Sequence, residues 1–129
     1  MSKATEQDFL VISRGQWDRE VSKEDIQQAI DDFYAWLNRS IHEGKMKMGS
    51  RLAFEGATVS KHGIITDGPF GEAKEAIGGY WWIVAGSLDE AAMIIAENPC
   101  LNHGLFFEIR PTDASDATAF KVMTETPSE

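Results

Sequence analysis

The chain has 129 residues, of which 43% are hydrophobic and 26% charged, and its formal net charge is −9. This length suits a single domain that buries a sizeable core. The strong negative charge argues against binding of nucleic acids and of anionic membrane surfaces, because both carry charge of the same sign.

The first two predicted elements are a buried strand and a long amphipathic helix. Residues 9–12 form a continuous apolar run, which is typical of a central strand buried on both faces, and a loop is expected over residues 14–18. Ser22 is the predicted N-cap of a helix that stops at Gly44. The apolar face of this helix has spacings of three and four residues: Ile26, Ile30, Phe33, Leu37 and Ile41, flanked by Ala29 and Trp36.

The middle of the chain predicts a strand followed by a hairpin. Residues 46–54 alternate, and the mostly apolar side of this strand consists of Met46, Met48, Ser50, Leu52 and Phe54. Residues 57–61 and 64–65 flank a turn that contains Gly63. Two short strands around such a turn indicate a β-hairpin.

The last third predicts a strand, a helix and a final strand. The strand covers residues 80–85, and Ser87 with Glu90 forms a capping box for the helix, which ends at Asn98. The residues expected to face inward from this helix are Leu88, Ala91, Ala92, Ile95 and Ala96. In the last strand Leu105, Phe107 and Ile109 alternate with Phe106, Glu108 and Arg110.

In this order the elements predict a ferredoxin-like α+β domain over residues 1–111, βαββαβ with an added hairpin. Two helices cover one face of an antiparallel sheet. The other face would expose Trp81 or Trp82, Phe106 or Phe107, and the methionines. An apolar face of this size predicts a homodimer, because a second copy would cover it.

Residues 112–129 form a polar tail that contains Ala117, Phe120, Val122 and Met123. Two interpretations apply, a disordered acidic end and an arm laid on the partner subunit. The arm is favoured because the apolar side chains would otherwise be solvated.

The stretch from Thr66 to Tyr80 is the densest in residues with special backbone demands. Its segments Thr66-Asp67-Gly68-Pro69-Phe70, Glu72-x-Lys74-Glu75 and Ile77-Gly78-Gly79-Tyr80 resemble the signature of the DGPF-domain family, within the YCII-related group. The resemblance extends from the first strand to Pro111. It implies a ferredoxin-like fold and a dimeric α+β barrel.

Asp67 is the first candidate site residue. It has two interpretations: a cap for its own Asp-Gly-Pro turn, or a carboxylate presented at the mouth of a pocket. Acid–base partners for it would be Tyr34, His62 or His103. Relatives in the YCII-related group are thought to pair an aspartate with a histidine of the first helix. That position falls near Phe33 or Tyr34 here, so such a dyad is not complete in this chain.

The candidate ligand-binding residues are Arg51, Glu72, Lys74, Trp81 and Arg110. Arginine gives bidentate contacts to carboxylates, and an aromatic ring stacks on planar groups. No metal-ligand spacing and no nicotinamide fingerprint are present in the sequence, so neither a metal nor a cofactor is expected.

The sequence thus favours a homodimeric, cytoplasmic protein that is a small-molecule-binding or regulatory module, with a pocket for a small polar ligand near Asp67. A lone cysteine, a polar start and the lack of a long apolar run favour the cytoplasm. The alternative is a small-molecule enzyme that uses acid–base chemistry of lyase, hydrolase or isomerase type.

Overall fold

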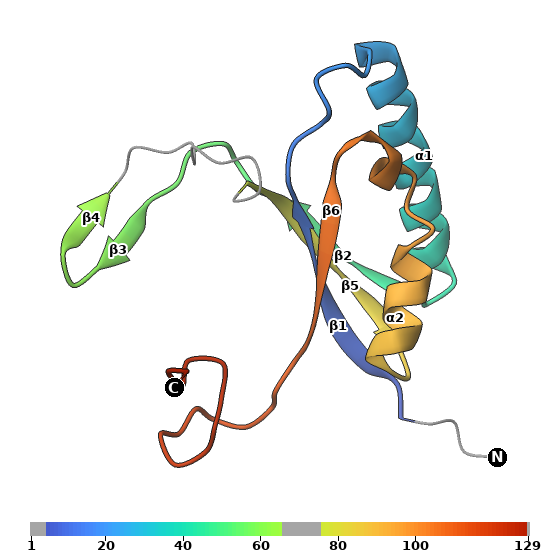
Figure 1. Ribbon diagram of the computed structural model, residues 1–129. Coiled ribbons are helices and arrows are strands. Elements are labelled where there is room, and N and C mark those ends of the chain that lie inside the picture. Colours follow the sequence, from blue (N-terminus) through green and yellow to red (C-terminus); the bar gives the residue numbers. More distant parts are fainter. Residues whose placement is uncertain (1–4, 66–75, 129) are drawn as a thin grey trace.

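The computed structural model describes residues 5–65 and 76–128. In this part of the chain, a four-stranded antiparallel sheet carries two α-helices on one face (Figure 1). The elements are β1 (Gln7–Arg14), α1 (Lys23–His42), β2 (Met46–Arg51), β3 (Thr58–Ser60), β4 (Gly63–Ile65), β5 (Ile77–Ala85), α2 (Leu88–Ile95), the 3-10 helix η2 (Pro99–His103) and β6 (Phe106–Pro111). The sheet order is β2-β5-β1-β6, which is compatible with the predicted ferredoxin-like fold.

Strand β1 lies in the centre of the sheet, as its apolar sequence predicted, but it is buried on one face only, because Leu10 and Ile12 on the other face are half-buried. It pairs antiparallel with β5, where Leu10 lies opposite Trp82, and with β6, where Leu10 lies opposite Arg110. Phe9 and Val11 are fully buried under the helices. Strand β1 continues to Arg14, so this residue belongs to the sheet and not to the loop expected at 14–18.

The core lies between the sheet and the helices. Its largest side chains come from three strands and from both helices, and they are Phe9, Val11, Trp36, Leu37, Met46, Trp81, Ile83 and Ile95. The rings of Phe33 and Phe107 contact Trp81 edge-on, with centroid distances of 5.2 and 5.7 Å. Burial of these aromatic rings supplies much of the apolar area removed from water on folding.

Both predicted helix starts are confirmed. The Ser22 hydroxyl accepts a hydrogen bond from the Asp25 amide, and the Ser87 hydroxyl accepts one from the Glu90 amide, each at 3.1 Å. The Glu90 carboxylate accepts its bond from the Gly86 amide, one residue before the N-cap. Helix α2 ends earlier than expected, and Ala91 and Ile95 are the residues it buries.

The prediction for the inward face of α2 was wrong at three positions, because Leu88, Ala92 and Ala96 are exposed. The helix has only eight residues, and its contact with the sheet follows a narrow stripe at Ala91 and Ile95 with Ile94 beside it. Residues 99–103 form η2, a short helix that the sequence analysis did not predict, with Asn98 as its N-cap.

Strand β2 is shorter and more exposed than expected. It ends at Arg51, and of its predicted apolar side only Met46 is buried, whereas Met48, Leu52 and Phe54 are exposed. The pairing with β5 is irregular between Lys47 and Ser50. A Cβ atom at Gly49 would lie only 2.0 Å from the Tyr80 carbonyl oxygen, so this irregularity needs glycine.

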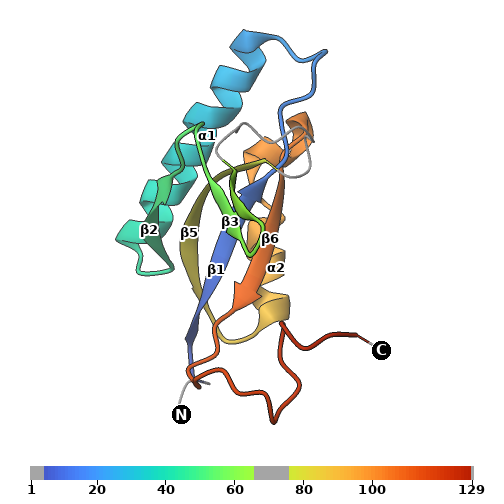
Figure 2. The same ribbon diagram turned by 90° about the vertical axis from the view of Figure 1, so that its left-hand side faces the viewer.

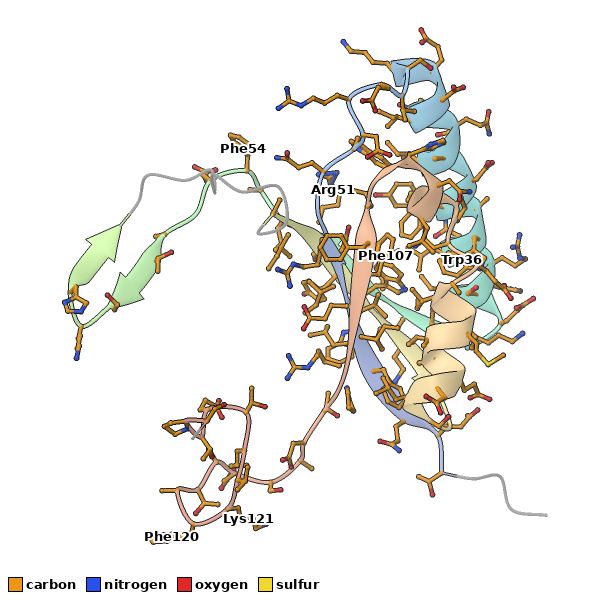
Figure 3. The ribbon with its side chains drawn as sticks, in the orientation of Figure 1. Trp36, Arg51, Phe54, Phe107, Phe120 and Lys121 are labelled. Carbon is orange, nitrogen blue, oxygen red and sulfur yellow. The ribbon has the colours of Figure 1, made fainter. Side chains whose placement is uncertain are left out.

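Two segments extend from the sheet face that carries no helix. The β3–β4 hairpin forms a separate two-stranded sheet, as predicted, and it projects away from that face (Figures 1 and 2). The segment after β6, residues 112–128, projects on the same side from the opposite end of the sheet. Phe54 and Phe120 lie on these two extensions (Figure 3).

Candidate functional site

One face of the sheet is not covered by helices, and we call it the open face. Side chains alternate between the faces along each strand, so the neighbours of the buried residues point here. The uncharged side chains of the open face are Leu10, Ile12, Tyr80, Trp82, Val84 and Phe106. Leu10, Ile12, Trp82 and Val84 are half-buried, and Tyr80 and Phe106 are 36% and 43% exposed. The open face is therefore an apolar and aromatic surface.

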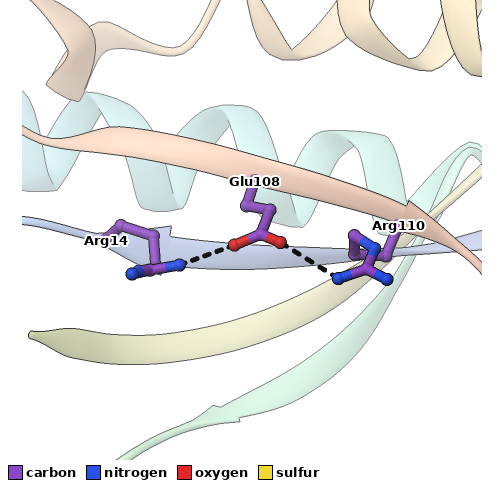
Figure 4. A network of polar contacts seen from close by, with 3 residues as sticks. All are labelled: Arg14, Glu108 and Arg110. Carbon is purple, nitrogen blue, oxygen red and sulfur yellow. Dashed lines mark hydrogen bonds and ion pairs between the residues drawn. The ribbon is translucent and has the colours of Figure 1, made fainter. Parts of the chain in front are cut away.

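A network of three charged side chains lies on this surface (Figure 4). The Glu108 carboxylate accepts a hydrogen bond from Arg14 Nη1 at 2.6 Å and one from Arg110 Nη1 at 3.2 Å. The guanidinium of Arg14 also lies over the ring of Phe106, 5.9 Å from its centroid. Two arginines share one carboxylate, so the network has a net positive charge.

A second ion pair on the open face joins Lys47 to Asp8, with 2.9 Å between Nζ and Oδ2. With the network this makes three basic and two acidic groups, a local charge of +1 on a chain whose net charge is −9. A cationic and aromatic surface of this kind suits planar anionic ligands, since arginine binds carboxylates and rings stack on rings.

Of the predicted ligand-binding residues that lie within the described ranges, Arg110 is the one whose side chain belongs to this network. Arg14 and Tyr80 were missed, whereas Trp82 and Phe106 were predicted only as alternatives to Trp81 and Phe107 for the uncovered face. The sequence did contain a signal for Arg14. This residue continues the alternation of Leu10 and Ile12 beyond the apolar run, so its side chain is expected on the same face of the strand. The choice between Trp81 and Trp82 depends on the register of β5, which the aromatic pair alone does not reveal.

The other described candidates lie elsewhere. Trp81 is 4% exposed and belongs to the core, with no hydrogen-bond partner for its Nε1 in the described structure. Arg51 is exposed at the end of β2. His62 is exposed in the turn between β3 and β4. These three residues are not brought together.

His103 lies on the helix side of the molecule, in an open groove of about 350 Å³ between α1 and η2. The groove is lined by Asp25, Gln28, Ala29, Asp32, Pro99, Asn102 and His103. The carbonyl of His103 accepts a hydrogen bond from the Asp18 amide at 2.8 Å, which fixes η2 to the loop before α1. The carboxylates that line this groove with His103 are those of Asp25 and Asp32 on α1.

Asp67, Glu72 and Lys74 lie outside the described residues. The chain resumes at Ala76, whose carbonyl accepts a hydrogen bond from the Gly15 amide at 3.1 Å. Ile77 is paired with Arg14 in the sheet register. The 66–80 stretch thus rejoins the sheet beside the Arg14 end of the charged network.

No group of three or more His, Cys, Asp or Glu side chains suited to a metal ion occurs within residues 5–65 and 76–128. Neither described helix combines the length and the apolar character that a membrane span requires. Burial raises the pKa of the Cys100 thiol to about 11, so this buried cysteine is protonated at neutral pH and unsuited to nucleophilic chemistry.

Comparison with known proteins gives the family. The family model of the YCII-related domain matches residues 9–113, which is most of the chain. The protein belongs to the YCII-related family. A search of curated proteins found no match. The matched YCII-related region covers both helices and the sheet from Phe9 onward, and it stops two residues after β6.

Proposed function

We propose that this YCII-related protein is a homodimeric module that binds a small molecule with a carboxylate group on the open face. The observation that carries this proposal is the network of Arg14, Glu108 and Arg110 on an apolar and aromatic sheet face. The Arg110 guanidinium has further N–H donors beyond the one it gives to Glu108, and Arg14 adds positive charge beside it. A ligand carboxylate would accept these donors, while its apolar part contacts Phe106 or Trp82.

The homodimer follows from the same surface. Leu10, Ile12, Tyr80 and Phe106 form a contiguous apolar area on paired strands, and an area of this kind is normally covered by another surface. Two open faces packed together would form a barrel with the charged networks inside. In such an interior the arginine–carboxylate contacts strengthen, because water is excluded.

We assign the chain to the DGPF type within the YCII-related family from residues 66–80, and we propose that Asp67 lies at the mouth of this pocket. The hydrogen bond between Gly15 and Ala76 supports this placement, since it brings the end of the stretch next to Arg14. His103 lies on the helix side. The acid–base alternative would therefore need Asp67 to act without His103 of the same subunit.

Benzoate and benzylamine test the binding proposal, because they share a ring and differ in charge. Addition of benzoate should shift the backbone amide signals of β1 and β6 in ¹H–¹⁵N NMR spectra. Addition of benzylamine should leave these signals unchanged. Arg110→Gln should weaken benzoate binding at least tenfold, on the order expected for a lost charged hydrogen bond. Arg39→Gln is the matched control, since Arg39 is exposed in the last turn of α1.

Equal binding of both probes, or binding of benzoate that Arg110→Gln leaves unchanged, would contradict the proposed site. Light scattering after size exclusion tests the dimer separately. Asp67→Asn should weaken benzoate binding if Asp67 positions the ligand, and only lower the melting temperature if it caps its turn. Chemical conversion of a bound carboxylate that Asp67→Asn abolishes would instead support the enzyme.

A further inference from the structure

Residues 112–128 hold a defined shape without packing on their own domain. The Asp113 carboxylate accepts hydrogen bonds from the hydroxyl and the amide of Ser115, at 2.6 and 2.9 Å, and these bonds lower the pKa of Asp113. Further on, the Met123 amide donates to the Thr126 hydroxyl, and the Thr126 amide donates to the Met123 carbonyl. These hydrogen bonds all join residues of the segment itself. Its turns are therefore set locally.

The loop that these turns form presents apolar side chains to the outside. Phe120 is 96% exposed and Val122 is 90% exposed, the highest values among the large hydrophobic residues of the described chain. Met123, in contrast, is half-buried, and its sulfur accepts a hydrogen bond from the Thr118 amide. An ordered loop that holds a phenylalanine and a valine outward is suited to contact another surface.

The segment extends from the sheet on the side of the open face (Figures 1 and 3). Nine residues lead from Pro111 to Phe120, and a chain of this length spans at most about 30 Å. Two sheets packed face to face lie about 10 Å apart. The segment is therefore long enough to pass from its own sheet edge to a second copy facing it.

The charges agree with this placement. Within residues 112–128, three carboxylates, Asp113, Asp116 and Glu125, accompany one cation, Lys121, which gives 1 − 3 = −2. The open face has a local charge of +1, from three basic and two acidic groups. The chain as a whole has a net charge of −9, so the positively charged open face is a surface that would attract an acidic segment.

We infer that residues 112–128 are an arm that packs on the open-face side of a second copy, with Phe120 and Val122 as its apolar anchors. This inference rests on the homodimer proposed above. A two-fold axis makes the contact reciprocal, so each subunit both gives and receives one arm. The occupant is a second copy because the segment and the surface that complements it occur on the same chain.

Photo-cross-linking gives the direct test. Benzoylphenylalanine is placed at Phe120 in one variant and at Met93 in a second, since Met93 is 72% exposed on α2, on the helix side. Isotopically labelled and unlabelled copies are mixed before irradiation, so that links within one chain and between chains differ in mass. Links from position 120 should join two chains and reach peptides of β1, β5 or β6. Links confined to one chain, or interchain links no more frequent than from position 93, would overturn the arm.

A dissociation constant provides an independent test that does not require a reactive group. The double variant Phe120→Ser with Val122→Ser should raise the dimer dissociation constant at least roughly tenfold, because each dimer loses four buried apolar side chains. Met93→Ser removes exposed apolar area on the helix side and should leave the constant unchanged. An unchanged constant in the double variant overturns the arm alone. A wild-type protein that is monomeric at all concentrations overturns both the arm and the proposed homodimer.

Discussion

Arg14 and Glu108 are 94 residues apart in the sequence, yet their side chains form a 2.6 Å ion pair across the junction of β1 and β6. Arg14 lies opposite Phe106 in the register, so it reaches Glu108 diagonally, two residues along β6. The pair joins the central strand to an edge strand. It also places a carboxylate between two guanidinium groups on the open face, which gives that face its charge.

Replacing Glu108 should therefore have two measurable effects. Glu108→Gln should lower the free energy of unfolding by about 1 kcal/mol, because both arginines lose their charged acceptor in a partly buried setting. It should also strengthen benzoate binding, since the guanidinium donors become available to the ligand. Urea titration and the benzoate NMR titration measure the two effects.

Asp8→Asn is the matched control for this change. Asp8→Asn breaks the ion pair between Asp8 and Lys47, and both of these side chains are more exposed than Arg14 and Glu108. It should therefore lower the free energy of unfolding by less than about 0.5 kcal/mol. If Glu108→Gln lowers the free energy of unfolding as little as Asp8→Asn and leaves benzoate binding unchanged, the network neither stabilises the sheet nor affects ligand binding on the open face.

Trp81 and Trp82 are sequence neighbours that point to opposite faces of the sheet, so their replacement should have different effects. Trp81→Ala should lower the free energy of unfolding by about 3–5 kcal/mol, because it removes a core ring packed on Phe33 and Phe107. Trp82→Ala should lower the free energy of unfolding by less and should weaken the proposed homodimer. Chemical denaturation at one fixed protein concentration, followed by light scattering over a dilution series, separates the two effects.

A reversed outcome, with Trp82→Ala the more destabilising at high dilution, would mean that Trp82 belongs to the core of the single subunit.

Local sequence signals predicted most of the secondary structure. The caps at Ser22 and Ser87, the apolar run of β1 and the alternation of β6 depend on neighbouring residues, and the structure confirms all four. The errors arose where tertiary packing determines which residues of an element are buried. Met48 is exposed because β2 is irregular at Gly49, and α2 buries a narrower stripe than its apolar content indicated.

The candidate site was less predictable, because it is made of pairings between distant strands. Arg110 was identified from the polar side of its strand. Its carboxylate partner, Glu108, also accepts a hydrogen bond from Arg14, and no local sequence pattern connects Arg14 to Arg110. His103 and Arg110 are seven residues apart, yet η2 and β6 place them on opposite sides of the sheet. Their roles therefore depend on the fold and not on their spacing.

Gly104 should tolerate alanine poorly. Its φ is +113°, and an added Cβ would lie 2.7 Å from both the Asp18 amide nitrogen and the Gln16 carbonyl oxygen. Gly104→Ala should therefore lower the free energy of unfolding by at least about 2 kcal/mol, through backbone strain and a clash with a rigid neighbour. Gly44→Ala is the control, since Gly44 also has positive φ but has no atom within 4 Å of an added Cβ.

Gly44→Ala should cost only about 1 kcal/mol, from backbone strain alone. Equal costs for the two variants, measured by urea titration, would show that the loop before α1 can move away from Gly104.

Cys100 should make stability depend on pH in the alkaline range. Burial raises the pKa of its thiol from 9.0 to about 11, so the folded protein keeps a proton that the unfolded chain releases. The stabilisation from this group is complete below pH 9 and decreases as the pH rises from 9 toward 11. The free energy of unfolding of the wild type should therefore fall more steeply over this range than that of Cys100→Ala.

Both proteins share every other titrating group, so the difference between their pH profiles isolates the thiol. The same burial predicts that a thiol reagent at pH 8 modifies Cys100 slowly in the folded protein and rapidly after unfolding in urea. Parallel pH profiles, together with rapid modification of the folded protein, would mean that the contact between Cys100 and the Ala29 carbonyl opens readily and that η2 separates from α1.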